Sequence, residues 1–421
     1  MVRFLPPQPS LVHLKNEAKL LHKAHQGKNP EVCPTLRRLH RFENASDEQI
    51  LATDLPLTEV QFALAMDYGF KDWAGLRQAV LSLKPTEDYA PDAQSDALLL
   101  PTPPAGIGGV NRFAAALSMA ASYLGTPADS TAVAGDSGLA FIFQADSLLH
   151  PWDTNTRQLD MGWWPLDSWG ATLRLNFLGR AYGIPMRLLP SIKAEYIADS
   201  AMHFQKYHQP EVLLSLQAGR PVVAVGLDIY FVCGYDSGNP PLLGQTSCEA
   251  ALNIHRMEKF PWEVIVLGEA VAPMDRPQTD VEALDFAIRL GRDETDLSAL
   301  PGKSAGRRSW DLWMAQLEDP ELCGPHFYHA NVVGHLHQNR AAAVKYLRAM
   351  SKRYSPLPSN ALTAAAVEYE TVLNKLEQIY PGKETLTTSA GRERLISVIR
   401  EIMSLEARAQ EQMGKALEAM R

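Results

Sequence analysis

The sequence predicts an α+β protein with a helical module in front of it and an all-helical region behind it. Between residues 108 and 272 a helical pattern comes first, and short apolar runs rich in β-branched residues follow it. The flanking regions have helical periodicity, and Pro-rich stretches separate them from the middle. Because the chain has 421 residues, it is too long for one hydrophobic core, and we expect several domains.

Residues 1–83 are predicted to form a small helical module. Apolar residues recur at helical spacing after Ser10, a residue suited to an N-cap. The sequence Thr58-Glu59-Val60-Gln61 has the form of a capping box and predicts a helix that stops at Gly69. Asp72 is predicted to cap the next helix. Residues 84–107 are rich in Pro, Asp, Ala and Ser, which indicates a linker.

The middle and the end of the chain differ in their hydrophobic period. A helix is predicted from Phe113 to Leu124, and strands are predicted at 221–225, 229–233, 241–244 and 264–267. Residues 280–421 are predicted to form a helical domain. Its expected helices cover 281–290, 310–317, 331–350, 361–380 and 392–420.

Composition excludes several function classes. Forty Lys and Arg against 48 Asp and Glu give a net charge of −8 without long single-sign blocks, so we expect neither a nucleic acid nor a membrane as partner. The first residues contain no signal-peptide pattern, and no segment approaches the roughly 18 apolar residues of a membrane span. The four scattered cysteines indicate a cytoplasmic protein. No metal or organic cofactor is predicted, and His22 and His25 are expected on a solvated surface.

Two segments of the middle region resemble a known family. They are Gly108-Gly109-Val110-Asn111-Arg112-Phe113 with its helical continuation, and Gly219-Arg220-Pro221-Val222-Val223 leading to Gly234-Tyr235-Asp236. Together they resemble the papain-like cysteine-peptidase C39-like group, which includes the BtrH-like acyltransferases. The run HANVVGHLHQNRAAAVKYLRAM resembles the helical tail attached to such domains in bacterial proteins. The N-terminal runs SLVHLKNEAKLLHKAH and ALAMDYGFKDWAGLRQAV resemble a helical segment that precedes ankyrin repeats in bacterial proteins.

The resemblance implies where the catalytic groups of such a fold stand. In that family a cysteine opens the first helix, a histidine stands shortly before Gly-Tyr-Asp, and a third partner follows on the next strand. Here these positions hold Asn111 or Arg112, then Asp228, then Gln245 or Thr246. A papain-type nucleophile needs a thiolate at a helix N-terminus and a neighbouring base. We therefore predict no catalytic residue.

The same helix start can serve binding instead. Backbone N–H groups and the Arg112 guanidinium would suit a carboxylate or phosphate. The alternative is an internal salt bridge from Arg112 to Asp228 or Asp236. Candidate ligand-binding residues are Asn111, Arg112, Trp164, Asp167, Asp228, Tyr235, Asp236 and Gln245. Trp164 and Asp167 belong to the most aromatic stretch, which can line a groove or form a hydrophobic seam.

Other nucleophiles fit less well. Strand alternation from Asp228 sends Cys233 to the opposite face, so Cys233 is predicted to be a core thiol. Cys248 follows the next strand and has no histidine near it in the sequence. The sequence Gly135-Asp136-Ser137-Gly138 resembles a serine-protease nucleophile loop, but Leu139 follows where that motif has glycine, and a turn is the expected structure.

Three functions remain open. The leading interpretation is a catalytically degenerate papain-like protein that binds a small anionic metabolite or an acidic peptide, with a protein partner reached through the helical modules. The second is an active acyltransferase or amidohydrolase that uses a displaced Cys248, or Asp228 as a base. The third is a helical interaction protein whose papain-like part is purely structural.

Overall fold

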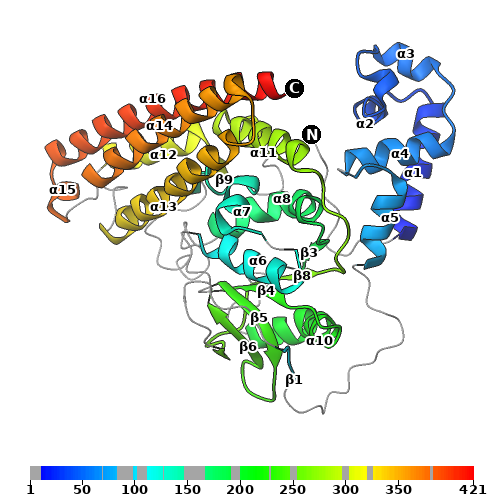
Figure 1. Cartoon of the computed structure of the whole chain (residues 1–421), viewed down its shortest axis with the longest axis horizontal. Helices are drawn as coiled ribbons and strands as arrows, with labels where there is room; N and C mark the ends of the chain where they lie inside the picture. Colours follow the sequence, from blue (N-terminus) through cyan, green and yellow to red (C-terminus); the bar gives the residue numbers. More distant parts are fainter. Residues whose placement is uncertain are drawn as a thin grey trace.

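The computed structural model describes twelve stretches of the chain. They are residues 11–68, 70–82, 98–101, 111–126, 128–146, 166–190, 200–226, 229–246, 254–295, 303–319, 326–379 and 383–421. Helices and one main antiparallel sheet are both present, which confirms the α+β class. Figure 1 shows the sheet in the lower part of the view, with long C-terminal helices above it and short N-terminal helices at the right.

The N-terminal helices form a module with its own apolar interior. Two hydrophobic clusters, built around Leu36 and Ile50 and around Leu14 and Leu64, contain residues from this part of the chain alone. The elements are α1 (Leu11–Gln26), η1 (Pro30–Val32), α2 (Cys33–Leu36), η2 (His40–Phe42), α3 (Asp47–Ala52), α4 (Leu57–Asp67) and α5 (Trp73–Ser82).

The helix caps of this module agree with the sequence at one place and differ at another. The Asp72 carboxylate accepts the Gly75 N–H at 2.7 Å, so the predicted cap of α5 is confirmed. The capping box predicted at Thr58 is wrong, because α4 begins one residue earlier, after the extended Pro56. The capping box lies instead before α3, where the Ser46 and Gln49 side chains bond each other's backbone N–H.

The two histidines of α1 were expected in solvent, and this expectation is wrong. His22 Nε2 lies 2.8 Å from the Leu55 carbonyl, and His25 Nε2 lies 2.9 Å from the Ile50 carbonyl. His25 is buried. The Ile50 carbonyl belongs to α3 and the Leu55 carbonyl follows that helix. The two histidine side chains therefore join α1 to α3 and to the segment after it.

The main sheet has seven strands, all paired antiparallel. Its order is β3-β8-β4-β5-β6-β7, and β1 pairs with β5. The four predicted strands are confirmed. The bounds are β1 (Leu98–Leu99), β3 (Met186–Leu188), β4 (Val222–Val225), β5 (Ile229–Tyr235), β6 (Leu242–Thr246), β7 (His255–Arg256) and β8 (Glu263–Leu267).

The short strand β1 lies inside the stretch that the sequence indicates as a linker. Leu98 pairs with Tyr235 and Leu99 pairs with Gly234, while the Leu100 side chain is buried. Leu100 is buried and Leu98 is half-buried, so these two side chains leave water at the sheet edge, while Leu99 remains 51% exposed. Residues 98–101 of the predicted linker therefore belong to the folded middle region.

One helix occupies the centre of the middle region. Helix α6 (Arg112–Tyr123) packs against β5 and β4, and its residues 113–121 are all buried. Alanines at many of these positions allow the helix to approach the sheet closely. The other helices here are α7 (Ser130–Asp136), α8 (Leu166–Tyr182), α9 (Ser200–His203), η4 (Phe204–His208, a π-helix) and α10 (Gln209–Gln217).

The predicted C-terminal helices are all present, with extended ends. They are α11 (Arg276–Gly291), α12 (Arg307–Glu318), α13 (His326–Ser351), α14 (Pro356–Gln378), α15 (Lys383–Thr387) and α16 (Ser389–Met420), and β2 (Gln144–Asp146) pairs with β9 (Lys303–Ala305). A single hydrophobic cluster runs from Leu100 to Leu417. The helical region and the α+β region thus share one core. No helix among the described stretches is long and apolar enough to cross a membrane.

Candidate functional site

The start of α6 is where the family resemblance places a nucleophile. Asn111 has extended backbone and caps the helix, because its Oδ1 accepts the Ala114 N–H at 3.0 Å. Its side chain is buried, and Arg112, the first helical residue, is half-buried. The predicted helix start is therefore confirmed. Neither an amide nor a guanidinium supplies the electron pair that acyl transfer requires.

Gln245 lies against the middle of this helix. Its side chain is fully buried on β6, with Nε2 at 3.9 Å from the Met119 sulfur. Its Oε1 has no hydrogen-bond partner among the described residues. Met119 lies seven residues beyond Arg112, a rise of about 10 Å along the helix. Gln245 is thus near the helix interior and not at its start.

Tyr235 and Asp236 lie together at the end of β5. The Asp236 carboxylate is held by both Nη atoms of Arg256, one of them at 2.5 Å, and it accepts the Gly238 N–H at 2.8 Å. These bonds lower the pKa of Asp236. The alternative ion pair between Arg112 and Asp236 is therefore wrong. Burial and the Asp236 charge raise the pKa of Tyr235.

Cys233 is a core thiol, as predicted. It is fully buried on β5, and burial raises its pKa to about 11. A thiol with such a pKa is almost entirely protonated at neutral pH and is a poor nucleophile. Cys233 therefore does not take the place of the missing cysteine.

Several predicted site residues lie outside the described residues. These are Trp164, Asp228 and the alternative nucleophile Cys248. Asp167 falls within the first turn of α8, and nothing is described of its side chain. Of the predicted set, the structure brings Asn111 next to Arg112 and Tyr235 next to Asp236.

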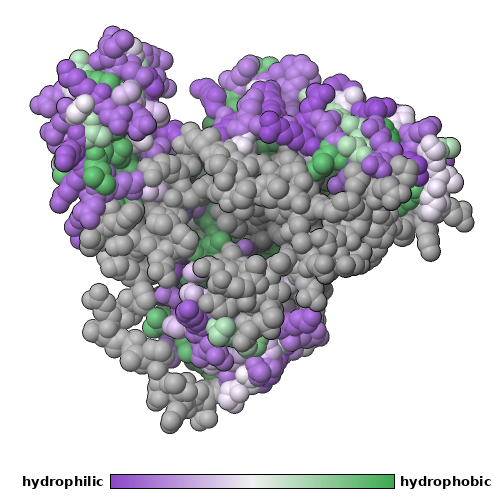
Figure 2. Space-filling view, turned by 180° about the vertical axis from the view of Figure 1, so that it is seen from behind, coloured by the Kyte–Doolittle hydropathy of each residue, from purple (hydrophilic) through white to green (hydrophobic). Residues whose placement is uncertain are grey.

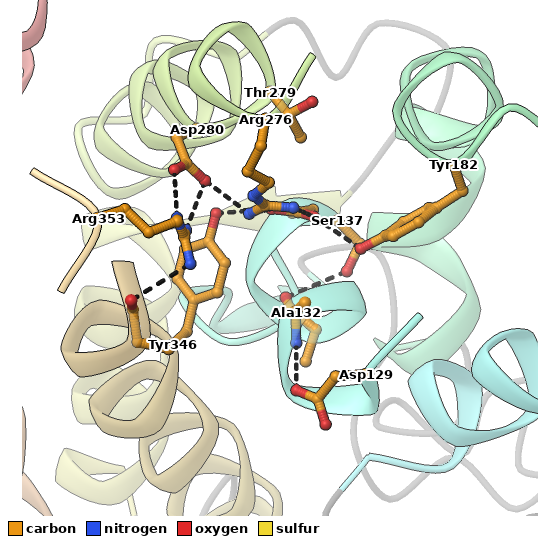
Figure 3. A network of polar contacts seen from close by, with 12 residues as sticks. Asp129, Ala132, Ser137, Tyr182, Arg276, Thr279, Asp280, Tyr346 and Arg353 are labelled. Atoms are coloured by element: carbon orange, nitrogen blue, oxygen red, sulfur yellow. Dashed lines mark hydrogen bonds and ion pairs between the residues drawn. The ribbon is translucent and has the colours of Figure 1, made fainter. Parts of the chain in front are cut away.

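A larger polar cluster, which we call the Asp136 cluster, was missed by the sequence interpretation. It consists of Asp136, Tyr182, Arg276, Asp280, Tyr346, Arg353 and Tyr354. Figure 3 shows Tyr182 of α8, Arg276 and Asp280 of α11, Tyr346 of α13 and Arg353, which follows α13, lying close to one another beside α7. The cluster therefore connects the middle region to the C-terminal helices.

Asp136 uses all of its hydrogen-bonding capacity inside this cluster. Both Arg276 Nη atoms donate to it at 2.7 and 2.8 Å, and the Tyr182 and Tyr346 hydroxyls donate at 2.6 and 2.7 Å. A carboxylate accepts about four such bonds. Burial and the Asp136 charge raise the pKa of both tyrosines well above the usual value. The four donor groups that face the Asp136 oxygens are therefore fixed in place.

Asp280 extends the cluster through α11. Arg276 Nη2 lies 2.6 Å from its carboxylate, and Arg353 adds two bonds at 2.7 and 2.8 Å. The Tyr354 hydroxyl donates to it at 3.1 Å, and burial together with this charge raises the pKa of Tyr354 to about 12. Asp280 is completely buried. Two buried aspartates thus share Arg276 between them.

A second buried ion pair, Arg340 with Glu406, also connects the C-terminal helices to the middle region. Arg340 of α13 is fully buried, and its Nε lies 2.5 Å from a Glu406 oxygen of α16. Its Nη1 donates to the Ala140 and Ile142 carbonyls at 3.2 and 2.9 Å. Arg340 therefore joins the segment after α7 to two C-terminal helices.

The turn predicted at Ser137 and Gly138 is confirmed. Helix α7 ends at Asp136, Ser137 is its C-cap and Gly138 has a φ of 86°, a conformation that suits glycine. The Ser137 hydroxyl is buried and donates to the Ala134 carbonyl at 3.2 Å. This serine has the local geometry of a cap. Gly135 is the sequence feature that marks the close approach of α7 to α13, because a Cβ at this position would overlap the Tyr346 ring.

The sequence matches no family model and no curated protein. Among the described residues, no group of three or more His, Cys, Asp or Glu side chains could hold a metal ion.

Proposed function

We propose that this protein is a papain-like, C39-like binding protein without a catalytic cysteine at the start of its central helix. The observation that carries the proposal is the occupation of that place by the Asn111 cap and by Arg112. A helix start with this composition can attract an anion, because its N–H groups and dipole are positive, but it cannot attack a carbonyl carbon.

The layout of the middle region supports the papain-like part of the proposal. A buried helix precedes an antiparallel sheet in the chain and packs on its strands β4 and β5. The family's third partner corresponds to Gln245 or Thr246, and the Gln245 side chain does face the helix, at Met119. An α+β layout of this order is the one that the sequence resemblance implies.

The ligand in this proposal is a small anionic metabolite or an acidic peptide. Arg112 supplies the charge, and since Asn111 already accepts the Ala114 N–H, the guanidinium is the main contact for a carboxylate or phosphate. No cofactor takes part. The protein acts in a reducing cytoplasm in this proposal, where the buried Cys33 and Cys233 remain thiols.

A second candidate function is a scaffold whose α+β part is purely structural. The Asp136 cluster favours it, because the buried ion pairs tie the C-terminal helices to α7. In that case the surfaces of the helices make the biological contacts, and the start of α6 has no ligand.

Titration calorimetry separates the two functions. We expect citrate, inorganic phosphate or a triglutamate peptide to bind the wild-type protein, and Arg112→Gln to weaken that binding by about tenfold. Arg394→Gln, an exposed arginine of α16, is the matched control and should leave binding unchanged. If none of these anions binds, or if Arg112→Gln binds as well as wild type, the ligand role is wrong and the scaffold remains.

Thiol labelling tests the active-enzyme alternative. Cys33 and Cys233 are buried, so both should react slowly with iodoacetamide near neutral pH. We expect Cys248 to react no faster than an ordinary exposed thiol. Fast labelling of Cys248 that competes with an acyl-thioester substrate would instead establish an enzyme with a displaced nucleophile.

A further inference from the structure

Helix α1 carries a row of three lysines along its outer ridge. Lys15, Lys19 and Lys23 are spaced four residues apart and are all exposed. Residues four apart lie one above another on a helix, so the row extends over about 12 Å. The apolar residues Leu14 and Ala18, on the other side of α1, are fully buried in the module. The row therefore faces away from the module's core.

None of these lysines takes part in an ion pair within the described residues. The neighbouring arginines behave differently: Arg37 pairs with Asp47 at 2.5 Å, and Arg38 pairs with Asp67 at 3.2 Å. The acid of α1, Glu17, accepts the Tyr68 hydroxyl at 2.9 Å. The module thus matches its arginines with acids and leaves the lysine row without one.

The row does not stabilise the helix that carries it. The two like-charged pairs, which are four residues apart, each destabilise the helix slightly. Lys23 lies in the last turn and gains from the helix dipole, but Lys15 and Lys19 do not. An apolar side chain, Leu20, is 68% exposed beside them. A bound partner with carboxylates would reduce the repulsion between the lysines, and an apolar side chain of that partner would remove Leu20 from water.

We propose that the lysine row with Leu20 docks an acidic helix or strand of a partner protein. Carboxylates at helical spacing complement the three ammonium groups, and one apolar side chain of the partner covers Leu20. Residues 1–83 contain ten Lys or Arg and nine Asp or Glu, while the rest of the chain contains 30 and 39. The module as a whole is thus close to neutral, the lysine row is a local excess of positive charge on it, and the site is independent of the function proposed for α6.

The observations favour a protein over a lipid surface or a nucleic acid. The apolar face of α1 is used inside the module, so the helix has no second face to insert into a membrane. Phosphates would gain nothing from Leu20, and the negative remainder of the chain would repel a polyanion. Seen from behind, the N-terminal helices present a mainly hydrophilic surface with small apolar spots (Figure 2), which agrees with a mixed polar and apolar contact.

Fluorescence anisotropy with three probes tests this proposal. The first probe is a helical peptide with three Glu spaced four residues apart and one Leu beside them, the second is a DNA duplex, and the third is a vesicle rich in phosphatidylserine. We expect the peptide to bind best, and the triple variant Lys15→Gln, Lys19→Gln, Lys23→Gln to weaken it by about tenfold or more. Leu20→Ser should weaken it about threefold.

A matched variant controls for net charge. The variant Lys259→Gln, Lys345→Gln, Lys352→Gln removes three exposed lysines from scattered positions and should bind the peptide like wild type. Equal weakening by both triple variants would show a nonspecific charge effect and overturn the proposal. Peptide binding that Leu20→Ser leaves unchanged, absence of peptide binding, or tighter binding of DNA or vesicles would overturn it too. Circular dichroism confirms that α1 remains helical in each variant.

Discussion

The Asp136 cluster and the start of α6 use polar groups in opposite ways. In the cluster, two fully buried aspartates are surrounded by arginines and tyrosines that use their oxygens completely. At the start of α6, one amide caps the helix and a half-buried arginine follows it. A fully partnered buried charge fixes the positions of the elements around it and has nothing left to offer a ligand. The Asp136 cluster therefore fixes the packing of α7, α8 and α11 and leaves no oxygen of Asp136 for a ligand.

The largest expected difference between the two regions is in stability. Asp136→Asn should lower the free energy of unfolding by about 3–5 kcal/mol, because it removes one partner of a buried ion pair. Arg112→Gln should change it by less than about 0.5 kcal/mol, because Arg112 is only half-buried and glutamine keeps much of the apolar part of its side chain. Urea unfolding followed by circular dichroism measures both values.

Asp129→Asn is the matched control for that experiment. Asp129 caps the same helix, α7, by accepting the Ala132 N–H at 3.1 Å, and Asn caps helices as well as Asp does. This control should leave stability nearly unchanged. If Asp136→Asn cost no more than Asp129→Asn, the cluster would not hold the two regions together.

The Arg340–Glu406 pair gives a smaller effect with a distinct pattern. Arg340→Met and Glu406→Leu should each lower the free energy of unfolding by about 3 kcal/mol, because each leaves one buried charge without its partner. The double variant should be more stable than either single variant. Its recovery will be partial, since the Ala140 and Ile142 carbonyls also lose their donor. Purely additive losses in the double-mutant cycle would contradict this account.

His208 should make the middle region sensitive to acid. Burial lowers the pKa of His208 from 6.5 to about 4, while its Nε2 donates to the Pro190 carbonyl and its Nδ1 has no partner within the described stretches. The unfolded chain therefore binds a proton more readily than the folded chain between these pH values. The free energy of unfolding contributed by this group falls as the pH drops from about 6.5 toward 4, by about 2 kcal/mol at pH 5.

Urea unfolding at neutral and acidic pH checks this sign. His208→Gln should lose stability at neutral pH and show a flatter decline toward acid than wild type. His40→Gln is the control for the removal of a histidine, because His40 is exposed in the N-terminal module. A wild-type profile that is no steeper than that of His208→Gln would show that His208 titrates normally in the folded protein.

Local patterns predicted most of the elements but few of the polar contacts. The strands at Val222–Val225 and Ile229–Tyr235 and the five long C-terminal helices are present, because their apolar periodicity is a local property. The capping box at Thr58 failed because Pro56 starts the helix earlier. His25 was misplaced because its partner, the Ile50 carbonyl, lies in another helix.

The candidate site shows the same difference between features that local sequence predicts and contacts that depend on distant residues. Cys233 could be interpreted from its own segment as a core thiol, and the helix start at Arg112 could be placed from its own pattern, whereas the cap that Asn111 provides was not predicted. The bond from Asp236 to Arg256 could not, because the two residues approach each other only when β6 and β7 fold beside β5. A sequence gives the direction of a side chain along one element, and the partner depends on which elements meet.

The sequence by itself determined the α+β order, the positions of the main helices and strands, and the absence of a thiol or hydroxyl nucleophile at the start of α6. Only the tertiary structure decided that the C-terminal helices share a core with the sheet, and that Asp136 meets Arg276 across 140 positions of the chain. The reason is physical: hydrophobic period and capping act within a few residues, whereas a buried charge is stable only where distant elements bring it enough partners.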